Sequence, residues 1–328
     1  MDRRRARTLR AGRLTRILPA GLAPVALGGL AMAAVLPIQS ARWIASGADK
    51  VAALSRRPVE CLGPTSLRSP DWSIEIGRAA FRTPLLLGGQ AARAGLSCES
   101  CHINGRTNPT FFFPGLSGAP GTADVTSALF SSHRDDGIDN PKPIPDLGGP
   151  KDRLRIDQAH ESAVLRQFIR GLVVEEFDGA EPPPAVLDGL TAYVRALDPA
   201  QCPAKADEPV RASASINDTR RAVRAAALML SRGDVPTAAL LIEAAQSQLA
   251  RIDERYSLPG LSGDRSRLRA ASLDLSSALA DVRAGRARSQ SELGDWLVRL
   301  PLWSRDIERD EGRSLYDPRV IQARLAAR

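Results

Sequence analysis

The chain has 328 residues, a formal net charge of +8 and four cysteines. The positive charge is uneven: residues 1–16 contribute +6, residues 17–204 contribute −2, and residues 205–328 contribute +4. No basic stripe interleaved with aromatic residues is present, so the sequence does not favour nucleic-acid binding. It also lacks a hydrolase nucleophile motif, a phosphate-binding loop and a zinc-protease helix.

The N-terminal segment 1–45 has the pattern of a cytoplasmic arm followed by a transmembrane helix. Seven arginines and one acidic residue in the first 16 positions precede the uncharged stretch 17–38, which is long enough to cross a bilayer as a helix. By the positive-inside tendency, we expect the arm to stay in the cytoplasm and the rest of the chain to lie outside it. The alternative is a cleaved signal peptide, with small-residue cleavage patterns only at Ala45–Gly47 and Ser46–Ala48.

Residues 60–204 are expected to form a first folded domain. All seven phenylalanines lie between Phe81 and Phe177, and aromatic side chains commonly shield a large, flat, apolar cofactor from water. Helical spacing of apolar residues, together with flanking glycines and prolines, delimits the elements. We expect helices at 72–81, 162–177 and 186–197, and a loop-rich stretch at 103–150.

The most specific motif is a Cys-x-x-Cys-His run made by Cys98, Cys101 and His102. Two thiols on one helical turn can add to the two vinyl groups of a haem, and the adjacent imidazole can then ligate the iron. A dithiol redox pair would normally follow a strand in a βαβ unit, and a zinc site would need a second ligand pair. The sequence has neither context, so we predict one covalently bound haem c with His102 as its proximal ligand.

The other two cysteines, Cys61 and Cys202, flank the haem motif on either side. Haem is normally attached to thiols outside the cytoplasm, where disulfides form and persist. We therefore predict a disulfide between these two residues, with two free buried thiols as the alternative.

Residues 208–328 are expected to form a small helical bundle. This region contains no histidine, cysteine or phenylalanine and would build its core from leucine, alanine, valine and isoleucine. We expect helices at 219–231, 236–256, 266–283 and 291–300, each followed closely by a glycine or a proline.

Several segments around the haem motif carry a family resemblance: Ile76–Phe81, Leu96–His102, Pro143–Leu147, Val164–Phe177 and Leu190–Leu197. In these segments the chain resembles the bacterial cytochrome c peroxidase family and its methylamine-utilisation relatives. The resemblance covers about residues 70–200 and does not extend to the C-terminal region.

The resemblance implies an all-α fold with a class I cytochrome c-like haem domain. In that plan an N-terminal helix crosses a C-terminal helix. The matching residues here are Gly77 and Phe81 on the first helix and Leu190 and Tyr193 on the second. Glycine is suited to such a crossing because it lets the two backbones approach closely. The family's peroxidases carry two haem motifs, one storing an electron and the other reacting with peroxide. This chain carries one.

The sixth iron ligand decides between electron transfer and small-ligand chemistry. The usual ligand of electron-transfer cytochromes c, methionine, is absent from the haem domain, since the chain has only Met1, Met32 and Met229. His160 is favoured because it precedes a predicted helix, about where the resembling family places a distal ligand. His133, in a polar loop, is the rival, and an open or non-histidine site is the third alternative.

Three residues have further candidate roles. The backbone carbonyl of Pro109 is a candidate acceptor for the second ring nitrogen of His102, and a plain turn proline is the alternative. Glu175 and Glu176 are candidates for a distal acid–base group if the site reacts with peroxide, and otherwise form a polar helix end.

Together these observations predict a mono-haem c-type cytochrome anchored in a bacterial cytoplasmic membrane, with its haem domain on the periplasmic side. The leading function is electron transfer with a redox partner protein or a quinol-linked complex. The alternative is a peroxidase-like enzyme that reduces hydrogen peroxide with electrons from a separate cytochrome. A haem module for sensing or assembly, with the C-terminal bundle as a docking surface, is a third hypothesis.

Overall fold

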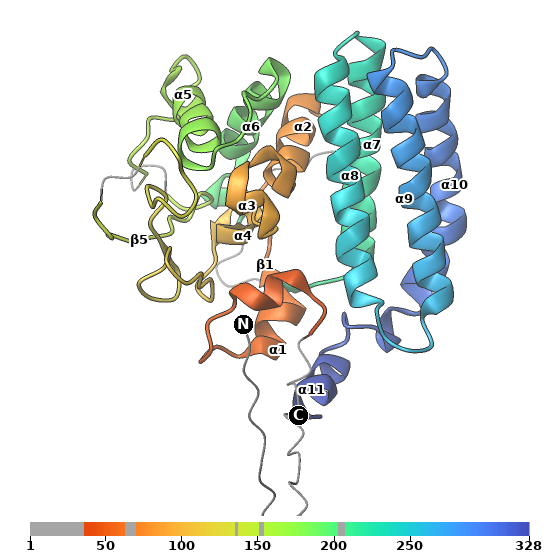
Figure 1. Cartoon of the computed structure of the whole chain (residues 1–328), viewed down its shortest axis with the longest axis horizontal. Coiled ribbons are helices and arrows are strands. Elements are labelled where there is room, and N and C mark those ends of the chain that lie inside the picture. The colour runs from red at the N-terminus through yellow and green to blue at the C-terminus, as the bar shows by residue number, and fades with distance from the viewer. Residues whose placement is uncertain (1–35, 63–69, 135–136, 151–153, 203–206, 328) are drawn as a thin grey trace, which may run out of the picture. The chain divides into compact units, whose positions relative to one another are not determined.

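Two helices that cross at a pair of glycines organise the part of the chain that carries the haem motif. They are α2 (Trp72–Phe81) and α6 (Pro184–Ala196) of the computed structural model, which describes residues 36–62, 70–134, 137–150, 154–202 and 207–327 (Figure 1). A Cβ atom on Gly77 would lie 1.9 Å from the carbonyl oxygen of Gly189, so only glycine permits this approach.

The expectation that Gly77 marks a helix crossing is confirmed by this geometry, while its partner Gly189 was not identified from the sequence. One turn further along α2, the ring of Phe81 packs on that of Tyr193, with ring centroids 5.1 Å apart. The N-terminus of α2 is capped by the side chain of Asp71, which accepts hydrogen bonds from the next turn. The mostly helical fold is confirmed.

The segment between α2 and α6 contains short elements joined by turns. They are η2 (Pro84–Leu86), α3 (Gly89–Arg93), α4 (Cys98–Cys101), β2 (His102–Ile103), β3 (Arg106–Thr107), β4 (Thr122–Ala123), β5 (Lys142–Pro143) and α5 (Val164–Gly171). Strands β2 and β3 pair with each other, as do β4 and β5. The single helix predicted at 162–177 is instead α5 followed by one π-helical turn, η4 (Leu172–Glu176).

The C-terminal region forms four long helices that run side by side (Figure 1). They are α7 (Ala212–Ser231), α8 (Val235–Arg255), α9 (Ser262–Arg283) and α10 (Ser289–Arg309). The prediction that the last helix ends at Pro301 is wrong, because α10 continues through it. Leu300 and Ile307 on either side are fully buried, so tertiary packing holds the helix together, and Pro301 itself lies on the exposed face.

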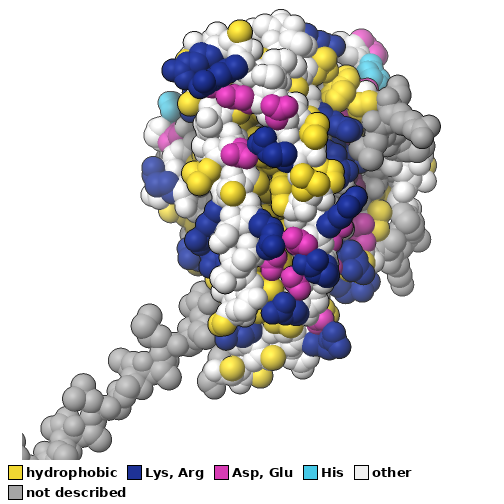
Figure 2. All heavy atoms as spheres, turned by 90° about the vertical axis from the view of Figure 1, so that its right-hand side faces the viewer, with side chains coloured by type: hydrophobic (Ala, Val, Ile, Leu, Met, Phe, Trp, Pro, Cys, Tyr) yellow, Lys and Arg dark blue, Asp and Glu magenta, His cyan; other side chains and the backbone are white. Residues whose placement is uncertain are grey.

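The outer face of α9 and α10 exposes three large apolar side chains, Leu273, Val298 and Leu302. On the face of the molecule drawn in Figure 2, apolar side chains lie among basic and acidic residues. Single exposed apolar side chains of this kind are ordinary for a protein surface.

The described part of the chain begins with a segment that packs into the fold. It comprises η1 (Gln39–Trp43), α1 (Lys50–Ser55) and β1 (Arg56–Pro58), and β1 pairs with β6 (Asp207–Pro209). Leu36 and Ile38 are buried in a cluster with Ile321 of the C-terminal helix α11 (Pro318–Ala326). Residues 36–45, which the sequence assigned to the arm and anchor, thus contribute to the folded core.

Among the described residues, no helix is long and apolar enough to cross a membrane. The stretch predicted to do so, 17–38, lies outside the described residues except for its last three positions. All described residues belong to one compact unit.

A buried ion-pair network joins the α2–α6 pair to the C-terminal helices. Arg78 lies 2.7 Å from carboxylate oxygens of both Glu60 and Asp218, and Arg82 lies 2.7 Å from Glu60. The phenol of Tyr193 also donates a hydrogen bond to Glu60. Because Asp218 belongs to α7, these charges connect the two halves directly, and one continuous hydrophobic core spans both.

Replacement of Gly77 by alanine should lower the free energy of unfolding by about 3 kcal/mol, because the added methyl group would force the α2 and α6 backbones apart. Denaturant unfolding followed by circular dichroism measures this. Gly294→Ala in α10 is the matched control: no atom lies within 4 Å of its Cβ position, so this substitution should be neutral or slightly stabilising. Equal losses in the two variants would contradict the tight crossing.

Replacement of Glu60 by glutamine should cost about 3–5 kcal/mol at neutral pH, since it removes the closest carboxylate partner of the buried Arg82 and one of the two partners of Arg78. Burial alone would raise the pKa of Glu60, but the adjacent Arg82 and Arg78 hold it well below its usual value of 4.5. The ionised Glu60 therefore stabilises the fold above the pKa that this group has in the unfolded chain. This stabilisation is lost as the pH falls below that pKa and towards the lower pKa of the folded state.

The difference in stability between the wild type and Glu60→Gln should thus be largest at neutral pH and shrink on acidification below about pH 4. Unfolding curves at a series of pH values test this. Glu208→Gln removes the partner of Arg57 at a more exposed ion pair and should cost less than about 1 kcal/mol. A pH-independent difference for Glu60→Gln would show that the network does not depend on this charge.

Candidate functional site

The two motif cysteines lie on a single helical turn, α4. The backbone N–H of Ser97 donates to the Ser100 hydroxyl at 3.0 Å, and the backbone N–H of Ser100 donates to the Ser97 carbonyl at 2.9 Å. This cap begins the helix at Cys98 and places Cys101 one turn later, so both thiols project from the same short element. Both side chains are half-buried and unbridged.

The thiols of Cys98 and Cys101 are neutral at physiological pH, because burial raises the pKa of each to about 12. Dithiol oxidoreductases need a thiolate, which a depressed pKa favours. Among the described residues, no three histidine, cysteine or acidic side chains lie close enough to hold a metal ion together. The environment of these cysteines therefore differs from that of a redox pair or a zinc site.

His102 follows α4 directly, and its ring is held by the backbone of a distant loop. Its Nδ1 lies 3.0 Å from the carbonyl oxygen of Pro145. Burial lowers the pKa of His102 to about 4, so the ring is neutral. A carbonyl oxygen can only accept, so the proton is on Nδ1 and the lone pair of Nε2 is available to a ligand. The candidate acceptor Pro109 is therefore wrong, and Pro145 takes that role.

A tight hairpin brings Pro145 to His102. Strands β2 and β3 are joined by Asn104 and Gly105, both with positive φ, the conformation for which Asn-Gly turns are suited. The hairpin then binds the Pro145 loop, because the Thr107 hydroxyl donates to the Ile144 carbonyl at 3.0 Å and the Leu147 N–H donates to Gly105. The Asn-Gly dipeptide was a sequence signal for this hairpin, within a stretch that the sequence analysis assigned to loop.

Cys61 and Cys202 are joined in a disulfide, 141 residues apart in sequence. The guanidinium of Arg106 lies 3.3 Å from the Cys61 sulfur and 3.0 Å from the Cys202 sulfur. The same arginine binds both carboxylate oxygens of Asp146 at 2.8 Å. Arg106 thus links the disulfide to Asp146. Because Asp146 directly follows Pro145, these contacts hold in place the loop that binds His102.

The two candidate sixth ligands lie on exposed segments. His133 is paired through Nδ1 with Asp178 at 3.1 Å, and its side chain is 64 % exposed. His160 is exposed just before α5. Within the described ranges, no hydrogen bond or ring contact joins either histidine to His102, so the identity of the sixth ligand stays a prediction.

Glu175 and Glu176 lie in the π-helical turn η4 and both face Arg134. Arg134 is 2.9 Å from Glu175 and 3.5 Å from the buried Glu176. Single π-helical turns are frequent at functional sites. Both carboxylates are therefore ion-paired at the end of a helix. Their role in acid–base chemistry stays a prediction.

Comparison with known proteins finds no family model, no curated protein and no solved structure that matches this chain.

Replacement of both Cys61 and Cys202 by serine should lower the free energy of unfolding by about 2–5 kcal/mol, because the unfolded chain regains the freedom that the cross-link removes. Denaturant unfolding with and without dithiothreitol measures this. The wild type should approach the stability of the double variant once reduced, whereas the variant should not respond to dithiothreitol. A wild type insensitive to complete reduction would contradict a stabilising disulfide.

Proposed function

We propose that this protein is a membrane-anchored, extracytoplasmic mono-haem c-type cytochrome that transfers electrons. The observation that carries the proposal is the geometry of α4 and His102: two neutral thiols on one turn, followed by an imidazole whose Nδ1 is engaged by Pro145. Engagement of Nδ1 leaves Nε2 as the ligating atom, as a proximal iron ligand requires. The donor set therefore fits haem c.

In this proposal Cys98 and Cys101 hold the haem covalently, and His102 ligates its iron. When bound, the haem supplies one-electron chemistry. The protein keeps His102 neutral and oriented. The Pro145 carbonyl accepts from its ring, and the Arg106–Asp146 ion pair holds the loop that carries Pro145. Second-shell contacts of this kind typically hold a ligand in one tautomer and one orientation.

The class I cytochrome c-like fold is part of the proposal. It is supported by the crossing of α2 and α6 at Gly77 and Gly189, and by the contact of Phe81 with Tyr193. Phe81 also lies near His102, with ring centroids 6.4 Å apart, so the crossing and the proposed haem ligand are neighbours.

An uncleaved anchor is supported by the packing of residues 36–45. Ala45 is 6 % exposed, and its N–H donates to the Thr110 carbonyl at 2.9 Å. Cleavage at Ala45–Gly47 or Ser46–Ala48 would remove Leu36 and Ile38 from the core that they share with Leu54. Retention of this segment favours a protein held in a bacterial cytoplasmic membrane, whose partners would be a redox protein or a quinol-linked complex.

The first experiment is expression of the full chain with haem-maturation machinery, followed by optical spectra of the oxidised and reduced protein with and without hydrogen peroxide. We expect covalent haem, absent in Cys98→Ser/Cys101→Ser, and a low-spin spectrum that peroxide does not change. Loss of the low-spin spectrum in His160→Ala, but not in His133→Ala, would identify the sixth ligand.

Two outcomes would overturn the proposal. A high-spin spectrum that shifts on addition of peroxide would replace electron transfer with the peroxidase-like alternative. A folded protein without covalent haem, despite active maturation machinery shown by a control cytochrome, would contradict haem attachment altogether.

A further inference from the structure

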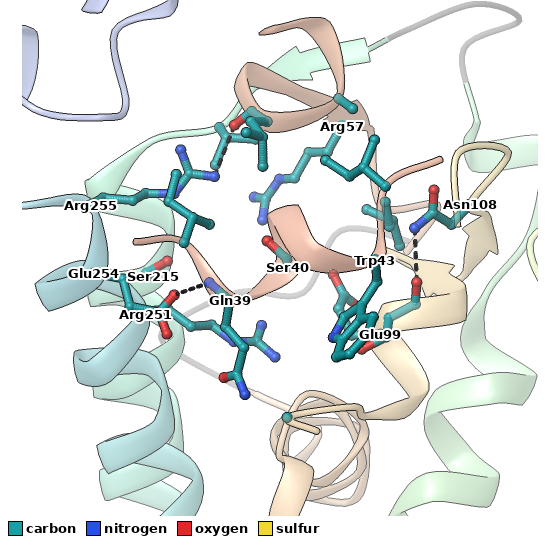
Figure 3. Close-up of a pocket in the computed structure, with 18 of the residues that line it drawn as sticks. Gln39, Ser40, Trp43, Arg57, Glu99, Asn108, Ser215, Arg251, Glu254 and Arg255 are labelled. Atoms are coloured by element: carbon teal, nitrogen blue, oxygen red, sulfur yellow. Dashed lines mark hydrogen bonds between the residues drawn. The ribbon is translucent and has the colours of Figure 1, made fainter. Parts of the chain in front are cut away.

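A cavity of about 190 Å³ lies between η1, the haem-motif helix α4 and helix α8 of the C-terminal bundle (Figure 3). Glu99 and Ser100, the two residues between the motif cysteines, form part of its wall. The opposite wall comes from Arg251, Glu254 and Arg255, more than 150 positions further along the chain. The cavity exists only where these distant segments meet.

The lining of this cavity carries an excess of positive charge. Five arginines but only three acidic residues, Glu99, Asp218 and Glu254, contribute to it. Burial raises the pKa of Glu99 and Glu254 and lowers the pKa of Arg251 and Arg255, so the excess of positive charge follows from the number of side chains of each sign. Asp218 is already paired with Arg78 at 2.7 Å outside the cavity.

Two of the arginines are held by backbone carbonyls and not by carboxylates. Arg251 donates to the carbonyl of Arg82 at 2.9 Å, and Arg255 donates to the carbonyls of Leu315 and Leu54. Within the part of the chain that the structure describes, neither forms a salt bridge. Figure 3 shows the guanidinium group of Arg251 directed into the cavity, with the Ser40 hydroxyl also facing it. Guanidinium groups match carboxylate and phosphate groups geometrically.

Part of the remaining lining is apolar and aromatic. Trp43, Ile44, Leu54 and Tyr316 all contribute to the wall. Trp43 is held in place by stacking on Phe113, with ring centroids 4.2 Å apart, and by its indole N–H, which donates to Ala94. A cavity with a cationic end and a rigid apolar wall selects a ligand that has both kinds of surface.

We propose that this cavity is a binding site for a small organic anion, whose carboxylate or phosphate group pairs with Arg251 and whose apolar body packs against Trp43. The site does not require haem, so its test is independent of the proposed electron-transfer function. Its position behind α4 places the bound anion against the same helical turn that carries the two motif thiols.

The experiment measures the unfolding midpoint of the full chain in detergent against increasing inorganic phosphate, benzoate or phenyl phosphate, with potassium chloride at matched ionic strength as the reference. A ligand that binds only the folded state raises the midpoint in a saturable way. We expect such a rise with benzoate or phenyl phosphate, and the comparison of these two shows whether a carboxylate or a phosphate is preferred. Inorganic phosphate should act more weakly because it lacks the apolar body.

Two variants test the position of the site. Arg251→Gln should weaken binding about tenfold to a hundredfold, since it removes the charged donor. Ser40→Phe should block the cavity from an exposed position while leaving all the arginines in place. Arg269→Gln, on the exposed side of α9, is the matched control and should bind as the wild type does.

The proposal is overturned if no anion raises the midpoint beyond the chloride reference. It is also overturned if Arg251→Gln and Ser40→Phe bind as tightly as Arg269→Gln, because the anion would then occupy a different surface. Should Arg251→Gln fail to fold, Ser40→Phe alone decides between these outcomes.

Discussion

The hydrogen bond from His102 Nδ1 to the Pro145 carbonyl is the interaction on which the candidate site depends. It determines the tautomer of the ring and so decides which nitrogen remains available as a ligand. Three other features support it: the Asn104-Gly105 turn, the bond from Thr107 to Ile144, and the Arg106–Asp146 ion pair beside the disulfide. The last two connect the motif to a loop some forty residues away.

The second organising feature is the charged network under α2. Burial of several charges is unfavourable unless each is paired, and here Glu60 and Asp218 pair with Arg78 and Arg82. Because the partners come from before α2, from α2 and from α7, the pairing specifies how the motif-bearing half docks on the bundle. The shared hydrophobic core makes the C-terminal helices part of the same folding unit as the haem motif.

Helix α4 consequently has two surfaces of different chemistry. The motif cysteines and His102 pack towards the core that contains Phe81, whereas Glu99 and Ser100 line the arginine-rich cavity. The bundle supplies Arg251 to that cavity, where its guanidinium donates to the Arg82 carbonyl at the end of α2. A ligand bound there would contact the turn that carries the proposed cofactor, so the two proposals concern opposite sides of one element.

The sequence by itself determined the features that depend on neighbouring residues. The helix at 72–81 follows from its apolar spacing, the motif turn from the spacing of Cys98 and Cys101, and the pairing of Cys61 with Cys202 from the number and positions of the cysteines. Only the tertiary structure decided that Pro145, not Pro109, holds His102, that α10 passes through Pro301, and that Arg251 meets α4. These outcomes depend on contacts between segments far apart in the chain. Local periodicity and capping carry no information about such contacts, because they arise from packing and loop closure across the whole fold.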